Sequence, residues 1–360
     1  MKTGDWEAHG HHRDAAYDGV VLHVVMWHDT SGPTRCFSGA EVPVLTLRDR
    51  LRAPASLWWS GGDGPGRSSA GQCPGAARGP GESQTLPIVE SAGDARFMSK
   101  SGAFRRDMER EPPGEVLYRG IMTALGYSRN TLPFLELSRR LPLRVMAALA
   151  DRTKGSPVQD CAARLGTVFL DAAGLGGAQP QSGSGTMSIR DWHLLRTRPS
   201  NSPAVRFAAM GHLLARYREH GLLSGMLGAV TGGPPCHENA WLDRALRVPG
   251  LGPGRAADII VNVVLPFSHA LGSALGQEPL CLRAITLYCM YHGTTPNSVT
   301  RHMADQLGLA PESVRSARRQ QGLIHTYRTL CAAGKCGICP LAGRVARSPD
   351  PGAVGRPAPG

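Results

Sequence analysis

The pattern of apolar residues predicts a short β-forming start. Residues 20–28 (VVLHVVMWH) are rich in β-branched side chains, and they predict a strand that is apolar on both faces and so lies inside a sheet. Residues 41–47 (EVPVLTL) predict a second strand that pairs with the first, and Pro43 places it at a sheet edge. The residues between the two segments carry glycine and proline and predict a turn.

Helical periodicity takes over after a stretch that has none. Residues 61–81 are rich in Gly, Ser, Pro and Arg and predict a flexible linker or a low-complexity insertion, with order returning near Asp94. The segments with helical spacing are 94–108, 115–125, 132–140, 143–150, 202–220, 254–265, 282–292, 296–307 and 311–330. We expect Gly126 to end the second of these helices and a Ser-Pro pair to begin the fifth.

These elements predict an α+β protein with a short N-terminal β-sheet remnant followed by a mainly α-helical domain. The expected parts are residues 1–52 (β remnant with an Asp/His cluster), 53–90 (flexible linker or low-complexity insertion), 91–345 (helical domain ending in a cysteine knuckle) and 346–360 (disordered tail). A chain of 360 residues with 41% hydrophobic residues can bury enough apolar surface for two ordinary domains. Its 45 Gly and 28 Pro exceed the usual share, which fits long unpacked segments.

Charge and cysteine usage narrow the class of protein. The formal net charge of +12 favours an anionic partner, either nucleic acid or a membrane surface, although a genome that encodes arginine freely gives the same balance. Nine unevenly placed cysteines do not form the framework of a secreted disulfide protein. The start is polar, and no apolar run reaches the ~20 residues of a membrane span. We therefore expect a cytoplasmic protein without a membrane partner.

Carboxylate and imidazole side chains crowd into the first 28 residues. The cluster contains Asp5, His9, His11, His12, Asp14, Asp18, His23 and His28. Such groups bind divalent metals and act as general bases near neutral pH, so Asp5, His9, His11 and Asp14 are candidate catalytic residues at a candidate divalent-metal site. No tight ligand spacing such as His-Glu-x-x-His occurs, and a histidine-rich surface loop with one core histidine is the alternative interpretation.

The same segment resembles a known family. Residues 5–25 (DWEAHGHHRDAAYDGVVLHVV) look like the signature of the bacterial domain-of-unknown-function 2851 family. Further matching stretches follow in order at 93–97, 117–118, 124–130, 198–201, 258–266 and the cysteine segment near the C-terminus. The family has no established activity, so the resemblance implies a relative and not a reaction.

The resemblance also implies a stretch that this chain lacks. Family members carry a Gly-Pro-Asp-Phe and a Val-Glu-Ile-His before the point that matches Asp5. That Asp and strand-borne Glu resemble the metal site of restriction-type nucleases, in which carboxylates hold Mg²⁺ and activate a water. Since Met1 stands where that strand should finish, we expect a misplaced start codon or a truncated copy, and a nuclease role of this form is in doubt.

Three cysteines near the C-terminus form the sharpest local motif. In Cys331-x4-Cys336-x2-Cys339 the Cys-x-x-Cys turn lets two thiolates meet one metal, and the third comes from the preceding helix end. We expect zinc or an iron–sulfur cluster at this knuckle, with His325 as a candidate fourth ligand. Cys289 and His292 are further candidates for the fourth ligand. Three reduced structural cysteines without a metal are the alternative interpretation.

Two stretches in the helical part resemble the helix-hairpin-helix iron–sulfur DNA glycosylases. Residues 320–339 are similar to the iron–sulfur loop, although the spacing is narrower and the fourth cysteine is absent. Residues 248–256 (VPGLGPGRA) are similar to the hairpin, in which glycine amides at a helix start bind a DNA phosphate. The catalytic Asp segment of that family has no counterpart here, and any tight turn before a helix needs similar glycines.

The hairpin and a basic segment supply candidate contacts to nucleic acid. The candidate residues are Gly250, Gly252, Arg255, Arg318 and Arg319. The last two belong to a basic run that is suited to a phosphate backbone and equally to a solvated helix face. The leading hypothesis is a nucleic-acid-binding protein related to a nuclease-like, metal-dependent family. A scaffold or interaction protein with a structural zinc and a small-molecule metal hydrolase are the alternatives, and enzymatic activity and oligomeric state stay open.

Overall fold

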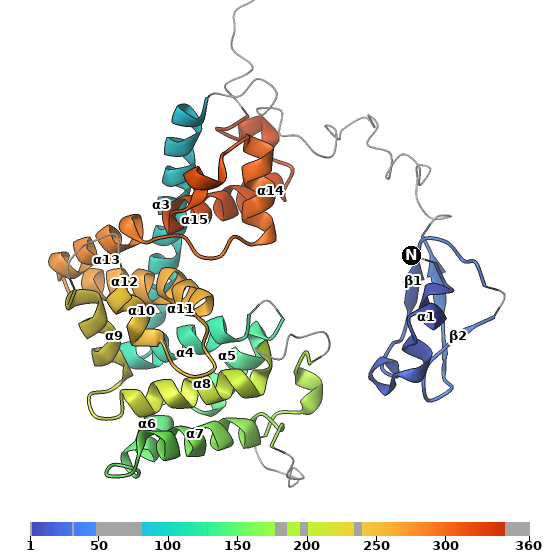
Figure 1. Ribbon diagram of the computed structural model, residues 1–360, viewed down its shortest axis with the longest axis horizontal. Helices are drawn as coiled ribbons and strands as arrows, with labels where there is room; N and C mark the ends of the chain where they lie inside the picture. Colours follow the sequence, from blue (N-terminus) through green and yellow to red (C-terminus); the bar gives the residue numbers. More distant parts are fainter. Residues whose placement is uncertain are drawn as a thin grey trace, which may run out of the picture. The chain divides into compact units, whose positions relative to one another are not determined.

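The computed structural model separates the chain into two compact units, Met1–Gln72 and Cys73–Gly360 (Figure 1). The structure describes residues 2–30, 32–47, 81–127, 129–176, 186–194, 201–233 and 240–342. Most of the predicted linker and the whole of the predicted C-terminal tail therefore lie outside the described residues. The predicted α+β class with a mainly helical domain is confirmed, because the strands fall in the first unit and helices build the second.

The first unit contains two small strand pairs and short helical turns. Its elements are α1 (Asp5–Ala8), η1 (His11–Arg13), η2 (Ala15–Tyr17), β1 (His23–Val25), β2 (Thr34–Arg35), β3 (Glu41–Val42) and β4 (Val44–Thr46). β1 pairs with β4 in parallel, with His23 opposite Val44, and β2 pairs with β3 antiparallel. The predicted pairing of the two apolar segments is thus confirmed.

The prediction that residues 20–28 form one strand inside a sheet is wrong. The strand has three residues, and Val21 is 84% exposed before it begins. Within β1, Val25 is buried while Val24 is 36% exposed, so one face of the pair packs inward and the other meets solvent. β-branched composition predicts extended backbone, but it does not say how many strands surround a segment.

The second unit is an assembly of helices. They are α3 (Glu82–Met108), α4 (Pro113–Leu125), α5 (Thr131–Arg140), α6 (Leu143–Asp151), α7 (Val158–Ala172), α8 (Pro203–Arg216), α9 (Leu222–Thr231), α10 (Ala240–Leu246), α11 (Pro253–Ile259), α12 (Leu265–Ala274), α13 (Glu278–Met290), α14 (Ser298–Leu307) and α15 (Ala317–Thr326). Helix α3 begins at Glu82, so residues 82–90 are helical and not linker. Pro87 looks like a break in the sequence, but near a helix start it removes only one backbone hydrogen bond.

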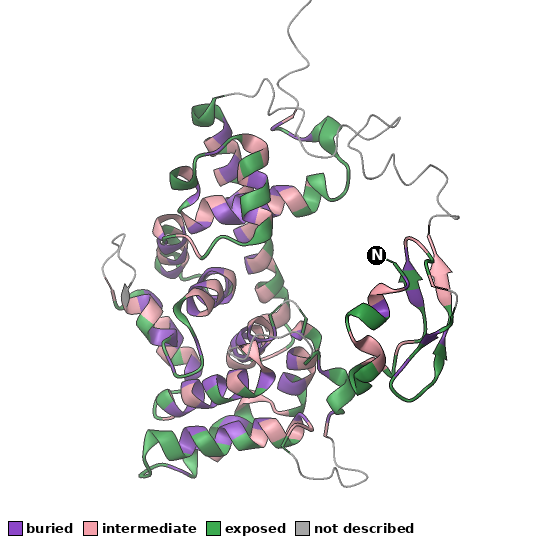
Figure 2. Ribbon diagram, turned by 45° about the vertical axis from the view of Figure 1, so that its right-hand side comes forward, coloured by how far each residue is buried: buried purple, intermediate pink, exposed green. Residues whose placement is uncertain are grey.

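The core of this unit surrounds one continuous helix. Helices α11 and α12 are joined by a π-helical turn at Ile260–Val264, and together they span Pro253–Ala274, 22 residues. This helix is long and apolar enough to cross a membrane, but 83% of its apolar 18-residue stretch is buried inside the unit. Figure 2 shows buried residues on the faces that the helices turn toward one another. Two polar side chains, Asp258 and Asn262, lie one turn apart within this otherwise apolar helix.

Candidate nucleic-acid interface

The hairpin between α10 and α11 is a tight turn with its apolar side chains turned inward. Val248 and Leu251 are 7% and 6% exposed, and the Leu251 amide donates to the Val248 carbonyl at 3.1 Å. Pro249 and Gly250 occupy the two central positions, and Gly250 has φ +78°. A proline followed by a residue with positive φ is the requirement of a type II turn. The sequence Val-Pro-Gly-Leu therefore folds this turn locally.

Glycine is required at position 250 for a second reason. A Cβ there would lie 2.8 Å from the Val205 carbonyl oxygen, so the turn sits directly on α8. The Gly250 carbonyl in turn accepts a hydrogen bond from Nη1 of Arg206 at 2.9 Å. Arg206 is 6% exposed and also contacts the Asn201 side chain. A buried guanidinium is thus fixed beneath the hairpin, and burial and the nearby Arg255 charge both lower its pKa.

The helix that follows the turn begins with free amide groups. Gly252 is the N-cap residue of α11 and makes no side-chain cap, and Pro253 has no N–H. Within the described part of the chain, the N–H groups of Gly252 and Gly254 donate no hydrogen bond. Gly252 is exposed, and a Cβ placed on it would meet nothing within 4 Å. Open amides at the positive end of a helix dipole are a site for an anion such as phosphate.

Arg255 lies one turn along the same helix. Its guanidinium stacks over the ring of Tyr127, 4.1 Å from the ring centroid, and its Nη1 lies 3.3 Å from Oδ2 of Asp258. Its Nε is buried and has no hydrogen-bond partner among the described residues. Burial lowers the pKa of Arg255 and raises that of Asp258, although the two charges attract each other. The Tyr127 ring and Asp258 therefore hold the Arg255 guanidinium in place beside the open amides.

Further titratable groups lie behind this pair. The hydroxyl of Tyr291 donates to the Asp243 carboxylate, whose other oxygen is 3.6 Å from Nε2 of His292. Burial, and then the hydrogen bond to Asp243, raise the pKa of Tyr291. Sequence reasoning missed Asp243 and Asp258; the only signal for Asp258 was a carboxylate within an otherwise apolar helix.

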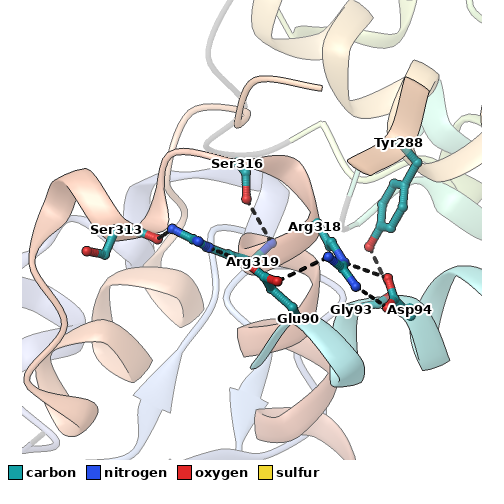
Figure 3. A network of polar contacts seen from close by, with 8 residues as sticks. All are labelled: Glu90, Gly93, Asp94, Tyr288, Ser313, Ser316, Arg318 and Arg319. Carbon is teal, nitrogen blue, oxygen red and sulfur yellow. Dashed lines mark hydrogen bonds and ion pairs between the residues drawn. The ribbon is translucent and has the colours of Figure 1, made fainter. Parts of the chain in front are cut away.

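The two other predicted contact residues, Arg318 and Arg319, are engaged inside the chain. Figure 3 shows them on α15, facing α3. Nε of Arg318 donates to Asp94 at 2.8 Å and its Nη1 to Glu90 at 3.1 Å, while Nε of Arg319 donates to Glu90 at 2.7 Å. The hydrogen bonds to Asp94 raise the pKa of Arg318 above its ordinary value. These arginines join two helices, and the basic face expected from the sequence is largely neutralised there.

Two histidines of the predicted N-terminal cluster pack against a tryptophan. Trp6 is buried, and the ring centroids of His11 and His23 lie 5.3 Å and 4.9 Å from its own. His9 lies outside them, its ring centroid 5.6 Å from that of His11. Burial lowers the pKa of His23, whose Nδ1 is 3.0 Å from the Thr34 hydroxyl. These contacts are packing contacts between aromatic rings.

The carboxylates of that cluster make local backbone contacts. Asp5 accepts from the Lys2 amide at 2.8 Å, and this hydrogen bond lowers its pKa. Asp14 caps η2 by accepting from the Ala16 amide at 2.9 Å. Both carboxylates are therefore engaged in helix starts or turns. The divalent-metal site predicted for this cluster stays a prediction.

The cysteine knuckle follows α15 through a π-helical turn, Tyr327–Cys331. Cys331 and Cys336 are exposed and Cys339 is buried, with its amide donating to the Cys336 carbonyl at 3.1 Å. His325 lines a groove of about 570 Å³ between α3 and the knuckle, and Pro340, next to Cys339, lines the same groove. Burial lowers the pKa of His325, which favours the neutral imidazole that binds metals. His325 and the knuckle are thus brought to one region.

Within the residues described, no three His, Cys, Asp or Glu side chains are grouped as ligands of one metal ion. The zinc or iron–sulfur prediction for the knuckle therefore rests on the cysteine spacing and on the position of His325.

Comparison with protein-family models gives one match, over residues 1–167, to the family described as protein of unknown function (DUF2851). The resemblance noted from the sequence is confirmed over those residues, which extend from α1 into α7. The hairpin lies outside the matched range. No curated protein and no solved structure matches the chain.

Proposed function

We propose that this chain, whose residues 1–167 match the DUF2851 family, binds nucleic acid by holding a backbone phosphate at the hairpin between α10 and α11. The observation that carries the proposal is the pair of open amides at Gly252 and Gly254. Backbone amides at a helix start bind phosphate oxygens without reading the base sequence.

Two arginines lie near the amides without occupying them. Arg206 lies beneath the turn, and Arg255 lies one turn along the helix with its charge partly offset by Asp258, so Arg206 contributes more of the local positive potential. The whole chain carries a formal charge of +12. Because phosphate neutralisation releases counterions, binding of this kind weakens steeply as the salt concentration rises. The proposal does not depend on Arg318 and Arg319, which pair with α3.

A carboxylate introduced at the hairpin tests the proposal. Gly252→Asp puts a negative charge where the phosphate would lie, and Asp is a favoured N-cap residue, so the fold is retained or stabilised. Gly228→Asp is the matched control, since Gly228 is exposed on α9 and a Cβ there also meets open space. Each variant changes the charge of the chain equally.

Fluorescence anisotropy with a labelled oligonucleotide at low salt gives the readout. A charge-assisted hydrogen bond contributes about 1.5–3 kcal/mol, so we expect Gly252→Asp to weaken binding by roughly 10- to 150-fold. Gly228→Asp should change affinity only slightly. No salt-dependent binding by the unmodified chain, or equal losses in both variants, would contradict the proposal.

A second candidate function is that of an interaction protein with a structural zinc. The observation in its favour is that Cys336 and Cys339 flank a short turn, that Cys331 ends the π-helical turn before it, and that His325 lies on the same groove as Pro340. Thiolates and a neutral imidazole would hold zinc in a closed site and fix the knuckle to α15. This candidate predicts metal binding without any salt-dependent affinity for nucleic acid.

A further inference from the structure

Tyr127 stands out among the exposed residues of the helical unit. Of the described residues other than glycine, it is the one with a positive φ, +55°. A bulky side chain in the left-handed region is strained, and such strain is retained mainly where the surroundings or a function require it. The side chain is 54% exposed, so burial of the ring does not explain the conformation.

The backbone around Tyr127 is fixed by its neighbours. Gly126 ends α4, and a Cβ on it would lie 2.3 Å from the Asn130 carbonyl oxygen, so the chain folds back tightly on itself there. Asn130 is buried and exchanges two hydrogen bonds with the backbone of His193, at 2.7 Å and 3.1 Å. The tight turn projects the Tyr127 ring toward the hairpin, where Arg255 meets it.

We propose that the Tyr127 ring, stacked on Arg255, is a platform for an unpaired nucleobase of the strand whose phosphate lies at Gly252. This inference rests on the proposed function and names its substrate class, a single-stranded or locally unpaired nucleic acid. Arg255 covers one face of the ring, and the exposure of Tyr127 leaves the rest open to solvent. An aromatic ring accepts any base by stacking, and an arginine behind the ring adds a cation–π contribution.

The distance between the amides at Gly252 and the Tyr127–Arg255 stack fits one nucleotide. Gly252 and Arg255 are three residues apart on one helix, which places them on one face about 5 Å apart along the axis. A phosphate at the amides would therefore have its own or the adjacent base within reach of the ring. In a duplex the bases stack on one another and are not available to the ring, so the platform discriminates against paired strands.

The test compares a labelled single strand with a duplex of the same sequence, using the full chain at low salt. Tyr127→Asn removes the ring, and Asn tolerates positive φ, so the turn is relieved of strain and keeps its shape. Tyr127→Phe keeps the ring. Leu132→Ala, which removes a 75% exposed side chain from α5, is the control for loss of apolar surface nearby.

We expect Tyr127→Asn to weaken single-strand binding by roughly 5- to 150-fold, which corresponds to ~1–3 kcal/mol for one stacked base. Duplex binding and the dependence of affinity on salt should change little, because no phosphate contact is lost. Tyr127→Phe and Leu132→Ala should behave as the unmodified chain. Equal affinity of Tyr127→Asn and the unmodified chain for the single strand would overturn the platform while leaving the hairpin proposal intact. Absence of binding to either nucleic acid would overturn both.

Discussion

The crossing of α3 and α15 allows a sharp prediction about stability. The two helices approach so closely that Gly93 on α3 and Gly322 on α15 each face backbone of the other helix. A Cβ on Gly93 would lie 2.2 Å from the Arg318 carbonyl oxygen, and one on Gly322 would lie 1.9 Å from that of Val89. Since ordinary contact begins at 3.4 Å, Gly93→Ala forces the helices apart by about 1.2 Å at this point.

The cost of that separation can be worked out from the contacts it disturbs. Overpacking of a closely packed interface costs typically 1–3 kcal/mol. The buried hydrogen bond from the Tyr288 hydroxyl to the Gly93 carbonyl, 2.9 Å long, contributes about 1 kcal/mol more. Alanine gains about 1 kcal/mol over glycine in a helix, which offsets part of the loss. We therefore expect Gly93→Ala to lower the free energy of unfolding of the helical unit by about 1–3 kcal/mol.

Gly102→Ala is the matched control for this prediction. It makes the same substitution in the same helix, but a Cβ on Gly102 meets only Nη1 of Arg106, at 3.6 Å. It should therefore raise the free energy of unfolding by up to about 1 kcal/mol. Urea unfolding followed by circular dichroism measures both values. If Gly93→Ala proves as stable as Gly102→Ala, the helices are not in backbone contact and the reasoning is refuted.

Two further predictions concern pH and metal. His269 is 9% exposed and packs against Phe97, and its Nδ1 lies 2.7 Å from the Ser101 hydroxyl. Burial lowers the pKa of His269 below 6.5, so the folded unit binds fewer protons than the unfolded chain near and below that pH. The free energy of unfolding should therefore fall as the pH drops below 6.5. His269→Gln should reduce that slope in urea unfolding series, and an unchanged slope would assign the effect to other groups. For the knuckle, metal analysis of the purified protein should find zinc or iron, and the Cys336→Ser variant should contain less of it. The control variant Cys281→Ser, in α13, should keep the metal content of the unmodified chain. Equal metal content in both variants would remove the knuckle as a site.

Local chemistry in the sequence predicted the parts of the fold that depend on neighbouring residues. Gly126 ends α4 as expected, and Ser202 caps α8 by accepting from the Val205 amide at 3.4 Å. The sequence offered the turn at Pro249 and Gly250 only through a resemblance, but a type II turn is fixed by those two residues alone. In each case the determining atoms lie within a few residues of one another, so their spacing in the chain is enough.

Features that depend on distant partners could not be predicted in this way. Arg318 looked like a free basic residue, but its partner Asp94 is 224 residues away. Arg255 was singled out for phosphate contact, while Tyr127, on which its guanidinium stacks, lies in the turn after α4, and the family resemblance over residues 124–130 did not mark it as a partner of Arg255. The helix start at Glu82 was missed because α3 packs against several neighbours, so its apolar residues gather on no single face. These side-chain partners and the start of α3 become visible only in the packed structure.

The pairing of α3 with α15 has a consequence for how the helical unit is completed during synthesis. These are the first and last α-helices of its described part, and the hydrogen bonds between them span 224 to 229 residues of sequence. Val89 and Leu323, both fully buried at their contact, belong to a cluster that does not exist until the final helix has left the ribosome. Such a closure is the slowest kind of contact to form, because the whole intervening chain must be ordered first. A nascent chain that stalls before Ala317 thus leaves Val89 of its first long helix uncovered, and exposed apolar residues of this kind are what chaperones and proteases recognise.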